Sequence, residues 1–292
     1  MALDFRQIRK PVRKLRKLLK KMPALPSPEQ VHDFRTNARR FEAILHAFAM
    51  DSSGIGRRTL KPLAKLRKRA GKVRDMDVLT AYAASVHPKN DEKECAVQLL
   101  EHLGAKREKK ARELHSSLKK NGNLSRKRLK RTQNKFKKIE RRRRSNGTGL
   151  ESSNVPAAAL EAAAELSDPA RLDHSNLHPF RLKVKALRNI LQLADSPDRQ
   201  LMDLLGSTKD AIGEWHDWEE LVAIAEKTLD HRSRCGLVRE LKSIARQKYH
   251  TALQKAQELR RKELGSPGRK NGRSQRSTPA TPVLSAALTL AA

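Results

Sequence analysis

Apolar residues recur every three or four positions along most of the chain, which is the spacing of one face of an α-helix. Residues 31–48 show this pattern clearly, and residues 177–194 repeat it. The two apolar stripes are Phe34, Ala38, Phe41, Leu45 and Phe48 in the first segment and Phe180, Val184, Leu187, Leu191 and Ala194 in the second. No segment alternates with the period of two that a half-buried strand would show. The pattern therefore predicts an all-α fold.

The same two segments also repeat a line of cationic residues on another side of each helix. This line contains His32, Arg35 and Arg39 in the first segment and His178, Arg181, Lys185 and Arg188 in the second. At about 1.5 Å per residue, the second line covers roughly 15 Å of helix. A row of that length suits an extended anion better than a single phosphate. We therefore expect each helix to show solvent a row of imidazole, guanidinium and ammonium groups.

A second repeated stretch follows each of these helices. Residues 71–79 and 213–221 match each other, so that Arg74 corresponds to His216. Arg67 and Lys209 each stand seven residues before that pair, which places both basic residues of a copy on one helix face. We interpret each stretch as a junction between helices. The repeat then covers two helices with their junction and predicts two related halves.

The remaining segments complete the prediction of helices and linkers. Ser27 and Pro28 are typical of an N-cap followed by a first-turn proline, and Pro62 is expected in the first turns of its helix. The further expected helices are residues 3–21, 57–73, 91–120, 155–166 and 230–264, and a dense basic run at 124–144 lies between the halves. The first half is expected at 3–144, a hinge at 145–152, the second half at 153–264, and a disordered basic tail at 265–292.

The charge of the chain indicates a polyanionic partner. Its 64 Lys and Arg exceed its 32 Asp and Glu, for a formal net charge of +32. Inorganic polyphosphate, nucleic acid and an anionic membrane surface all fit this excess. Aromatic residues make up only 3% of the chain, which disfavours a single-stranded nucleic-acid platform built on base stacking. The basic run 126–144 either extends the anion surface or forms a separate nucleic-acid or targeting patch, and a solvated helix and loop is its default interpretation.

Two cysteines, Cys95 and Cys235, are too few for a disulfide framework and lack the spacing of a zinc site, so we expect buried thiols in a reducing compartment. No stretch approaches the length of a secretory signal or a membrane span. These features predict a soluble, cytoplasmic protein.

With its duplicated His-x-x-Arg-x-x-x-Arg/Lys helix and its Arg-Asp-x-Asp and His-Asp-x-Glu stretches, the chain resembles the CHAD family, the conserved histidine α-helical domain. The resemblance covers residues 1–264. It implies two pseudo-symmetric four-helix bundles, and non-enzymatic binding of inorganic polyphosphate without a cofactor. It also implies an association with polyphosphate granules.

Carried over position by position, the resemblance implies a set of polyphosphate-binding residues. They are His32, Arg35, Arg39, Arg40, Arg67 and Arg74 in the first half and His178, Arg181, Lys185, Arg188, Lys209 and His216 in the second. Two positions depart from the expected pattern, since Glu42 and Ala186 stand where basic residues are usual. Each helix is therefore expected to bind polyphosphate less strongly at one position along its row of cations.

Two alternatives remain open at this stage. The chain could bind nucleic acid through backbone phosphates alone, or it could be a metal-dependent enzyme acting on polyphosphate. The acidic residues Asp75, Asp77, Asp217 and Glu219 are candidate metal ligands in the second case. We favour pairing of these carboxylates with the basic line, and thus no metal site, because a carboxylate aimed at Arg74 or His216 orients the donor and limits repulsion between the cations. A general acid or base role for His216 is not expected, because no nucleophile or second catalytic group accompanies it.

Overall fold

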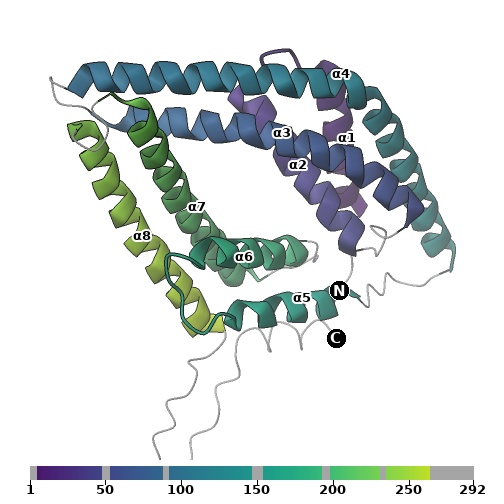
Figure 1. Ribbon diagram of the computed structural model, residues 1–292. Coiled ribbons are helices and arrows are strands. Elements are labelled where there is room, and N and C mark those ends of the chain that lie inside the picture. Colours follow the sequence, from purple (N-terminus) through teal and green to yellow (C-terminus); the bar gives the residue numbers. More distant parts are fainter. Residues whose placement is uncertain are drawn as a thin grey trace, which may run out of the picture. The chain divides into compact units, whose positions relative to one another are not determined.

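The computed structural model describes residues 5–47, 53–87, 92–146, 154–192, 198–230 and 235–263. Within these ranges the chain forms helices and no strand, which confirms the all-α prediction (Figure 1). The helices are α1 (Phe5–Lys21), α2 (Pro28–Ala47), α3 (Gly54–Ser85), α4 (Lys93–Asn146), α5 (Asn154–Ala164), α6 (Leu177–Leu191), α7 (Arg199–Thr228) and α8 (Gly236–Glu263), with a short 3₁₀ helix, η2 (Glu165–Ser167), after α5.

The start of α2 is capped as the sequence predicts. The backbone N–H of Gln30 donates to the Ser27 side-chain oxygen at 3.3 Å, and the Ser27 backbone N–H donates to the Gln30 side chain at 3.0 Å. This reciprocal pair satisfies two N–H groups that the first turn of a helix leaves without partners. Pro28 is the first helical residue, where its missing N–H costs nothing.

The predicted third helix, 57–73, is wrong at both ends, because α3 is one helix of 32 residues. It begins at Gly54, where the Ser53 side chain accepts a hydrogen bond from the Gly56 N–H at 3.1 Å. Pro62 therefore lies in the helix interior rather than in the first turns. At its other end α3 continues through Gly71, the residue interpreted above as the beginning of a junction.

The helix predicted at 91–120 is wrong at its C-terminal end, since α4 runs without interruption through Asn121, Gly122 and Asn123 to Asn146. Gly122 is buried, and a Cβ added there would lie 3.8 Å from the Leu19 carbonyl oxygen of α1. At that distance a Cβ would make ordinary van der Waals contact, so α1 packs directly against α4 at this position. The first two residues of the expected hinge 145–152 are helical, and the others lie outside the described residues, as does the expected tail 265–292.

The chain divides into two compact units that do not coincide with the two sequence halves. One unit contains α1 to α4 together with Asp217–Thr228 of α7 and Gly236–Ala245 of α8. The other contains α5, η2, α6, the part of α7 up to His216 and the part of α8 from Arg246. The arrangement as two four-helix bundles remains a prediction.

Each unit has its own apolar core. In the first, Leu79 and Leu99 pack with Leu221 and Leu241, and α3 runs alongside α4 (Figure 1). The free thiols of Cys95 and Cys235 are buried in this core, as predicted, and burial raises the pKa of the Cys95 thiol to about 11. The second core contains the apolar stripe of α6, namely Leu177, Phe180, Val184, Leu187 and Leu191, together with Trp215 of α7.

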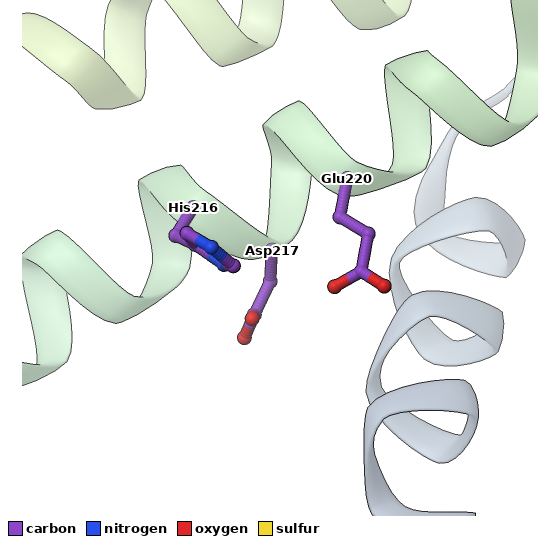
Figure 2. Close-up of side chains that lie close together, drawn as sticks. All are labelled: His216, Asp217 and Glu220. Atoms are coloured by element: carbon purple, nitrogen blue, oxygen red, sulfur yellow. The ribbon is translucent and has the colours of Figure 1, made fainter. Parts of the chain in front are cut away.

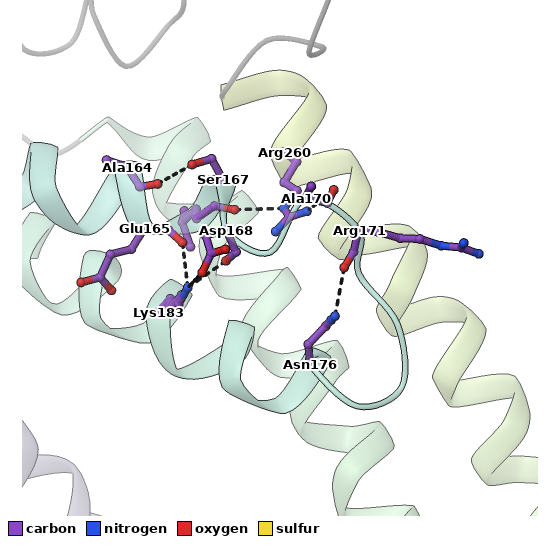
Figure 3. A network of polar contacts seen from close by, with 10 residues as sticks. Ala164, Glu165, Ser167, Asp168, Ala170, Arg171, Asn176, Lys183 and Arg260 are labelled. Carbon is purple, nitrogen blue, oxygen red and sulfur yellow. Dashed lines mark hydrogen bonds and ion pairs between the residues drawn. The ribbon is translucent and has the colours of Figure 1, made fainter.

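Side-chain contacts fix the segment between η2 and α6, and so position the start of α6 (Figure 3). Arg260 donates to the carbonyls of Leu166 at 3.0 Å and Ala170 at 3.2 Å, and its guanidinium lies 5.0 Å from the centre of the Phe180 ring. Lys183 of α6 donates to the Asp168 carbonyl at 2.8 Å. Because these contacts tie α5, α6 and α8 together, the residues near the start of α6 occupy a defined place.

A search of the described helices for a stretch sufficiently long and apolar to span a bilayer finds none.

Candidate functional site

The predicted anion-binding residues of the first copy lie on α2 and α3, within one compact unit. We call this set the first ridge: His32, Arg35, Arg39 and Arg40 on α2, with Arg67 and Arg74 on α3. His32 and Arg40 are exposed, and the other four are half-buried. The apolar stripe of α2 is in the core, with Phe34 and Phe41 at 0% exposure, so the predicted separation of the two faces is confirmed.

Arg35 is the best-anchored residue of the first ridge. Its Nη1 donates to the Gly71 carbonyl of α3 at 3.2 Å and to Asp75 Oδ1 at 3.0 Å. A Cβ added at Gly71 would lie 3.9 Å from Arg35 Cζ, so the guanidinium rests on bare helix backbone. Only 19% of the Arg35 side chain is exposed, so the surrounding atoms restrict the position of its charge.

Two further cations of the first ridge have acidic neighbours. Arg67 forms an ion pair with Glu42 at 3.2 Å, so the acidic departure noted in the sequence partly neutralises this position. Arg74 lies close enough to Glu29 to affect its titration. The pKa of Glu29 is lowered mainly by its hydrogen bond with Ser27, and the positive charge of Arg74 contributes.

The second copy forms an equivalent set in the other compact unit. We call it the second ridge: His178, Arg181, Lys185 and Arg188 on α6, with Lys209 and His216 on α7. All six are half-buried. The rings of His178 and His216 lie with their centres 4.4 Å apart and their planes at 34°. The structure therefore brings together His178, from the repeated histidine helix, and His216, from the repeated stretch 213–221.

Arg181 lies over a buried glycine of the next helix, as Arg35 does, but it bonds a carbonyl one helical turn before that glycine. Its Nε donates to the Lys209 carbonyl of α7 at 3.1 Å. A Cβ added at Gly213 would lie only 2.8 Å from Arg181 Cζ, so no side chain larger than hydrogen fits there without moving the guanidinium. Two helical turns further along α6, Arg188 lies over Gly206, with its Nε 3.5 Å from the Met202 carbonyl oxygen.

This packing explains why the junctions predicted at Gly71 and Gly213 are wrong. Both glycines are buried inside continuous helices, although glycine weakens a helix interior by about 1 kcal/mol relative to alanine. Each glycine instead lies beneath an arginine from the preceding helix of its repeat, and at Gly213 the absence of a side chain makes room for that arginine. The motif therefore marks a helix crossing, not a helix end.

The acidic residues near the ridges have different partners. Asp75 pairs with Arg35, as expected of a carboxylate that orients the basic row. Asp77 instead points into the core, where only 2% of its side chain is exposed, and pairs with Arg107 of α4 at 2.6 Å. Arg107 also donates to the Pro26 carbonyl at 2.8 Å. Its role was not predicted, because nothing in the sequence pattern links positions so far apart.

One group of side chains on α7 has the composition of a metal site. His216, Asp217 and Glu220 lie on the same side of the helix, and one potential ligand atom from each lies within 4.8 Å of the others (Figure 2). Glu220 was not predicted in this role, although its spacing of four residues from His216 places both on one helix face. A divalent cation that accepts nitrogen and oxygen ligands would fit these donors.

Lys209 forms an ion pair with its neighbour Asp210. Arg39 and Lys185, at corresponding positions of the two ridges, are both half-buried. That the two ridges face one common channel remains a prediction.

Comparisons with known proteins agree with this architecture. A family model described as the CHAD domain matches residues 6–226. The crystal structure of the CHAD domain from the plant Ricinus communis is similar to this chain with a TM-score of 0.57 and 16% sequence identity, covering 87% of each chain. No curated protein sequence matches. Because the family match spans well over half of the 292 residues and includes both histidine helices, the chain belongs to the CHAD domain family.

Proposed function

We propose that this protein binds inorganic polyphosphate, without catalysis, along the first and second ridges. The observation that carries the proposal is the duplicated crossing at which Arg35 lies over Gly71 and Arg181 over Gly213. In each copy the arginine is held by a backbone carbonyl of the next helix. Its remaining N–H groups are thus positioned before any ligand arrives.

The chemistry of the ridges fits a chain of phosphates. Guanidinium groups donate to phosphate oxygens in pairs, lysine adds a mobile charge, and histidine adds one or two donors. A charge-assisted hydrogen bond contributes about 1.5–3 kcal/mol, so a row of them can bind a long anion tightly. Anchoring the arginines beforehand also reduces the entropy lost on binding. No part of this recognition requires a base or a sugar.

Removing both anchored arginines tests the proposal. We expect the Arg35→Ala/Arg181→Ala variant to lose at least about tenfold in polyphosphate affinity, since each change removes one charge-assisted contact. The matched control is Arg57→Ala/Arg246→Ala, which removes the same charge from two exposed positions outside both ridges. Affinity can be measured by titration calorimetry, with circular dichroism to verify helicity. Equal losses in the two variants would show that only bulk charge matters.

Competition separates polyphosphate from nucleic acid as the ridge ligand. Labelled long-chain polyphosphate is bound first and then challenged with duplex DNA, single-stranded RNA and short phosphates at physiological salt. We expect polyphosphate bound at the ridges to resist displacement at equal phosphate concentration. Displacement by nucleic acid at that concentration would contradict a specific polyphosphate site. Salt dependence alone does not discriminate, because counterion release weakens every polyanion complex.

The cluster of His216, Asp217 and Glu220 favours one second candidate, a metal-dependent enzyme acting on polyphosphate. Incubating the protein with polyphosphate and Mg²⁺, Mn²⁺ or Zn²⁺, and measuring orthophosphate, tests it. We expect no release above the metal-only control. Release that is lost in the Glu220→Gln variant would establish the enzyme instead.

A further inference from the structure

A second strongly basic surface lies on α1 and the C-terminal part of α4, apart from both ridges. Residues 5–21 contain nine Lys and Arg and no Asp or Glu. Residues 114–139 contain ten Lys and Arg and, again, no acidic residue. No carboxylate on either segment can therefore neutralise its neighbours along the helix. Earlier in α4 the cations have such partners, since Lys110 pairs with Glu113 and Arg112 with Glu108.

The two segments pack against each other, and a hydrogen bond identifies the edges that meet. Arg16 Nη1 of α1 donates to Gln133 Oε1 of α4 at 3.0 Å. Residues three, four, seven or fourteen positions from Arg16 and from Gln133 share those edges. The cations among them form what we call the basic seam: Arg9, Arg13, Arg16 and Lys20 on α1, and Lys119, Arg126, Lys130 and Lys137 on α4. On α4 the seam ends before Glu140, which is seven positions after Gln133. None of the eight cations is buried.

The seam has the dimensions of a double-stranded partner. From Lys119 to Lys137 it extends about 27 Å at 1.5 Å per residue, about three quarters of one turn of duplex DNA, which is about 34–36 Å. Packed helices lie about 8–10 Å apart, so α1 and α4 carry two neighbouring rows of cations. A duplex presents two phosphate strands on either side of a groove, whereas polyphosphate is a single thread. Two rows therefore match the duplex better.

Phe136 of α4 and the apolar face of α1 are not available to a ligand, although Leu124 of α4 is 45% exposed. Phe136 is the one aromatic residue in 114–146 and is 2% exposed, so α4 offers no platform for stacking single-stranded bases. Val12 and Leu15, on the apolar face of α1, are at most 1% exposed. A membrane-binding helix must insert that face between lipids, so the packing of α1 opposes this role.

We propose that the basic seam binds the phosphate backbones of double-stranded nucleic acid without reading its sequence. The residues involved are separate from those of the first and second ridges. The inference therefore does not depend on polyphosphate binding, and each can fail without the other. In the cell it would let one protein hold a nucleic-acid duplex and a second polyanion at distinct places.

The test uses the full chain and measures binding to a labelled 20-base-pair duplex of DNA and of RNA, about two turns long, by fluorescence anisotropy at several salt concentrations. The seam variant is Arg13→Gln/Lys20→Gln/Lys130→Gln/Lys137→Gln, four exposed positions. The control is Lys93→Gln/Lys109→Gln/Lys227→Gln/Arg239→Gln, which removes equal charge from exposed positions outside the seam. Circular dichroism verifies that both variants fold.

We expect the seam variant to lose at least about tenfold in duplex affinity at physiological salt and the control to change by less than about threefold. The salt dependence of the seam variant should weaken by about one unit of slope for each phosphate contact removed. Its polyphosphate affinity should stay close to that of the unmodified protein, and single strands of the same length should bind more weakly than duplexes.

Several outcomes would overturn the proposal. They are absence of duplex binding by the unmodified protein, equal losses in the seam and control variants, and single strands bound as tightly as duplexes. A seam variant that loses polyphosphate binding in parallel would assign the seam to the polyphosphate surface. If the variant lost only binding to vesicles containing phosphatidylserine, the seam would be a membrane contact.

Discussion

The two ridges share one architecture but differ in what surrounds their charges. In the first, the anchored arginine bonds both a backbone carbonyl and the carboxylate of Asp75, and Arg67 is paired with Glu42. In the second, Arg181 bonds the Lys209 carbonyl, and Arg188 occupies the position that corresponds to Glu42. The duplication has thus kept the geometry of the arginine–glycine crossing while the charge around it has diverged.

This comparison suggests that geometry and charge are separable in the fold. A carbonyl oxygen orients a guanidinium without cancelling its charge, whereas a carboxylate does both. We therefore expect the second ridge to contribute more than the first to polyphosphate affinity. Four predictions follow from that difference, beginning with the largest expected effect.

Exchanging the residues at the corresponding positions should reverse the difference between the ridges. Arg188→Glu should lower affinity for short-chain polyphosphate more than about tenfold, since it removes a charge-assisted donor and adds a repelling charge. Glu42→Arg should raise affinity, because it releases Arg67 and adds a cation. Titration calorimetry measures both affinities. The Arg188→Gln and Glu42→Gln variants serve as controls, because they remove the charge without reversing it. An unchanged affinity in Arg188→Glu would remove this position from the site.

The glycines beneath the two arginines should respond unequally to a methyl group. Gly213→Ala should displace Arg181 and weaken polyphosphate binding about three- to tenfold, because a Cβ there would lie 2.8 Å from Arg181 Cζ. At Gly71 the distance is 3.9 Å, which is ordinary contact. Gly71→Ala should therefore keep its affinity and gain about 0.5–1 kcal/mol in helix stability. Thermal melts would then show a rise of about 2–4 °C. Similar binding losses in both variants would contradict the proposed difference in crossing distance.

The pH dependence of binding should belong mainly to the second ridge. His216 corresponds to Arg74, and histidine changes its charge between pH 5 and 8 whereas arginine does not. Protonation adds positive charge, so lowering the pH from 8 to 6 should tighten polyphosphate binding. His216→Arg should make binding tighter at pH 8 and flatten the profile, with His32→Asn as the control on the first ridge. A profile unchanged by either substitution would place the titrating group elsewhere.

The smallest effect should come from Asp75, whose side chain is 47% exposed. Asp75→Asn removes a carboxylate that competes with phosphate for Arg35 while keeping an oxygen that can accept its hydrogen bond. Exposed ion pairs contribute about 0.2–1 kcal/mol, so affinity should rise by less than about fivefold. A loss of affinity would show that Asp75 is needed chiefly to orient Arg35.

Much of the fold was predictable from local patterns in the sequence. The apolar stripe of α2 is buried where its spacing placed it, and the Ser27–Pro28 cap forms as expected. The errors arose at Gly71 and Gly213, which were interpreted as parts of junctions between helices. Local propensity does disfavour glycine within a helix, but the packing of a neighbouring helix against both glycines overrides it here. The pattern of residues along one helix does not show how closely a neighbouring helix packs against it.

The candidate site, like the fold, was predictable from the sequence only in part. The sequence by itself determined the repeat, the cationic rows and the excess of positive charge, because these depend only on residue identity and spacing. Tertiary structure alone decided that Arg35 and Arg181 rest on glycine backbone, that Arg67 meets Glu42, and that Asp77 turns inward to Arg107. Each of these contacts joins residues at least 25 positions apart, and their meeting depends on how whole helices cross.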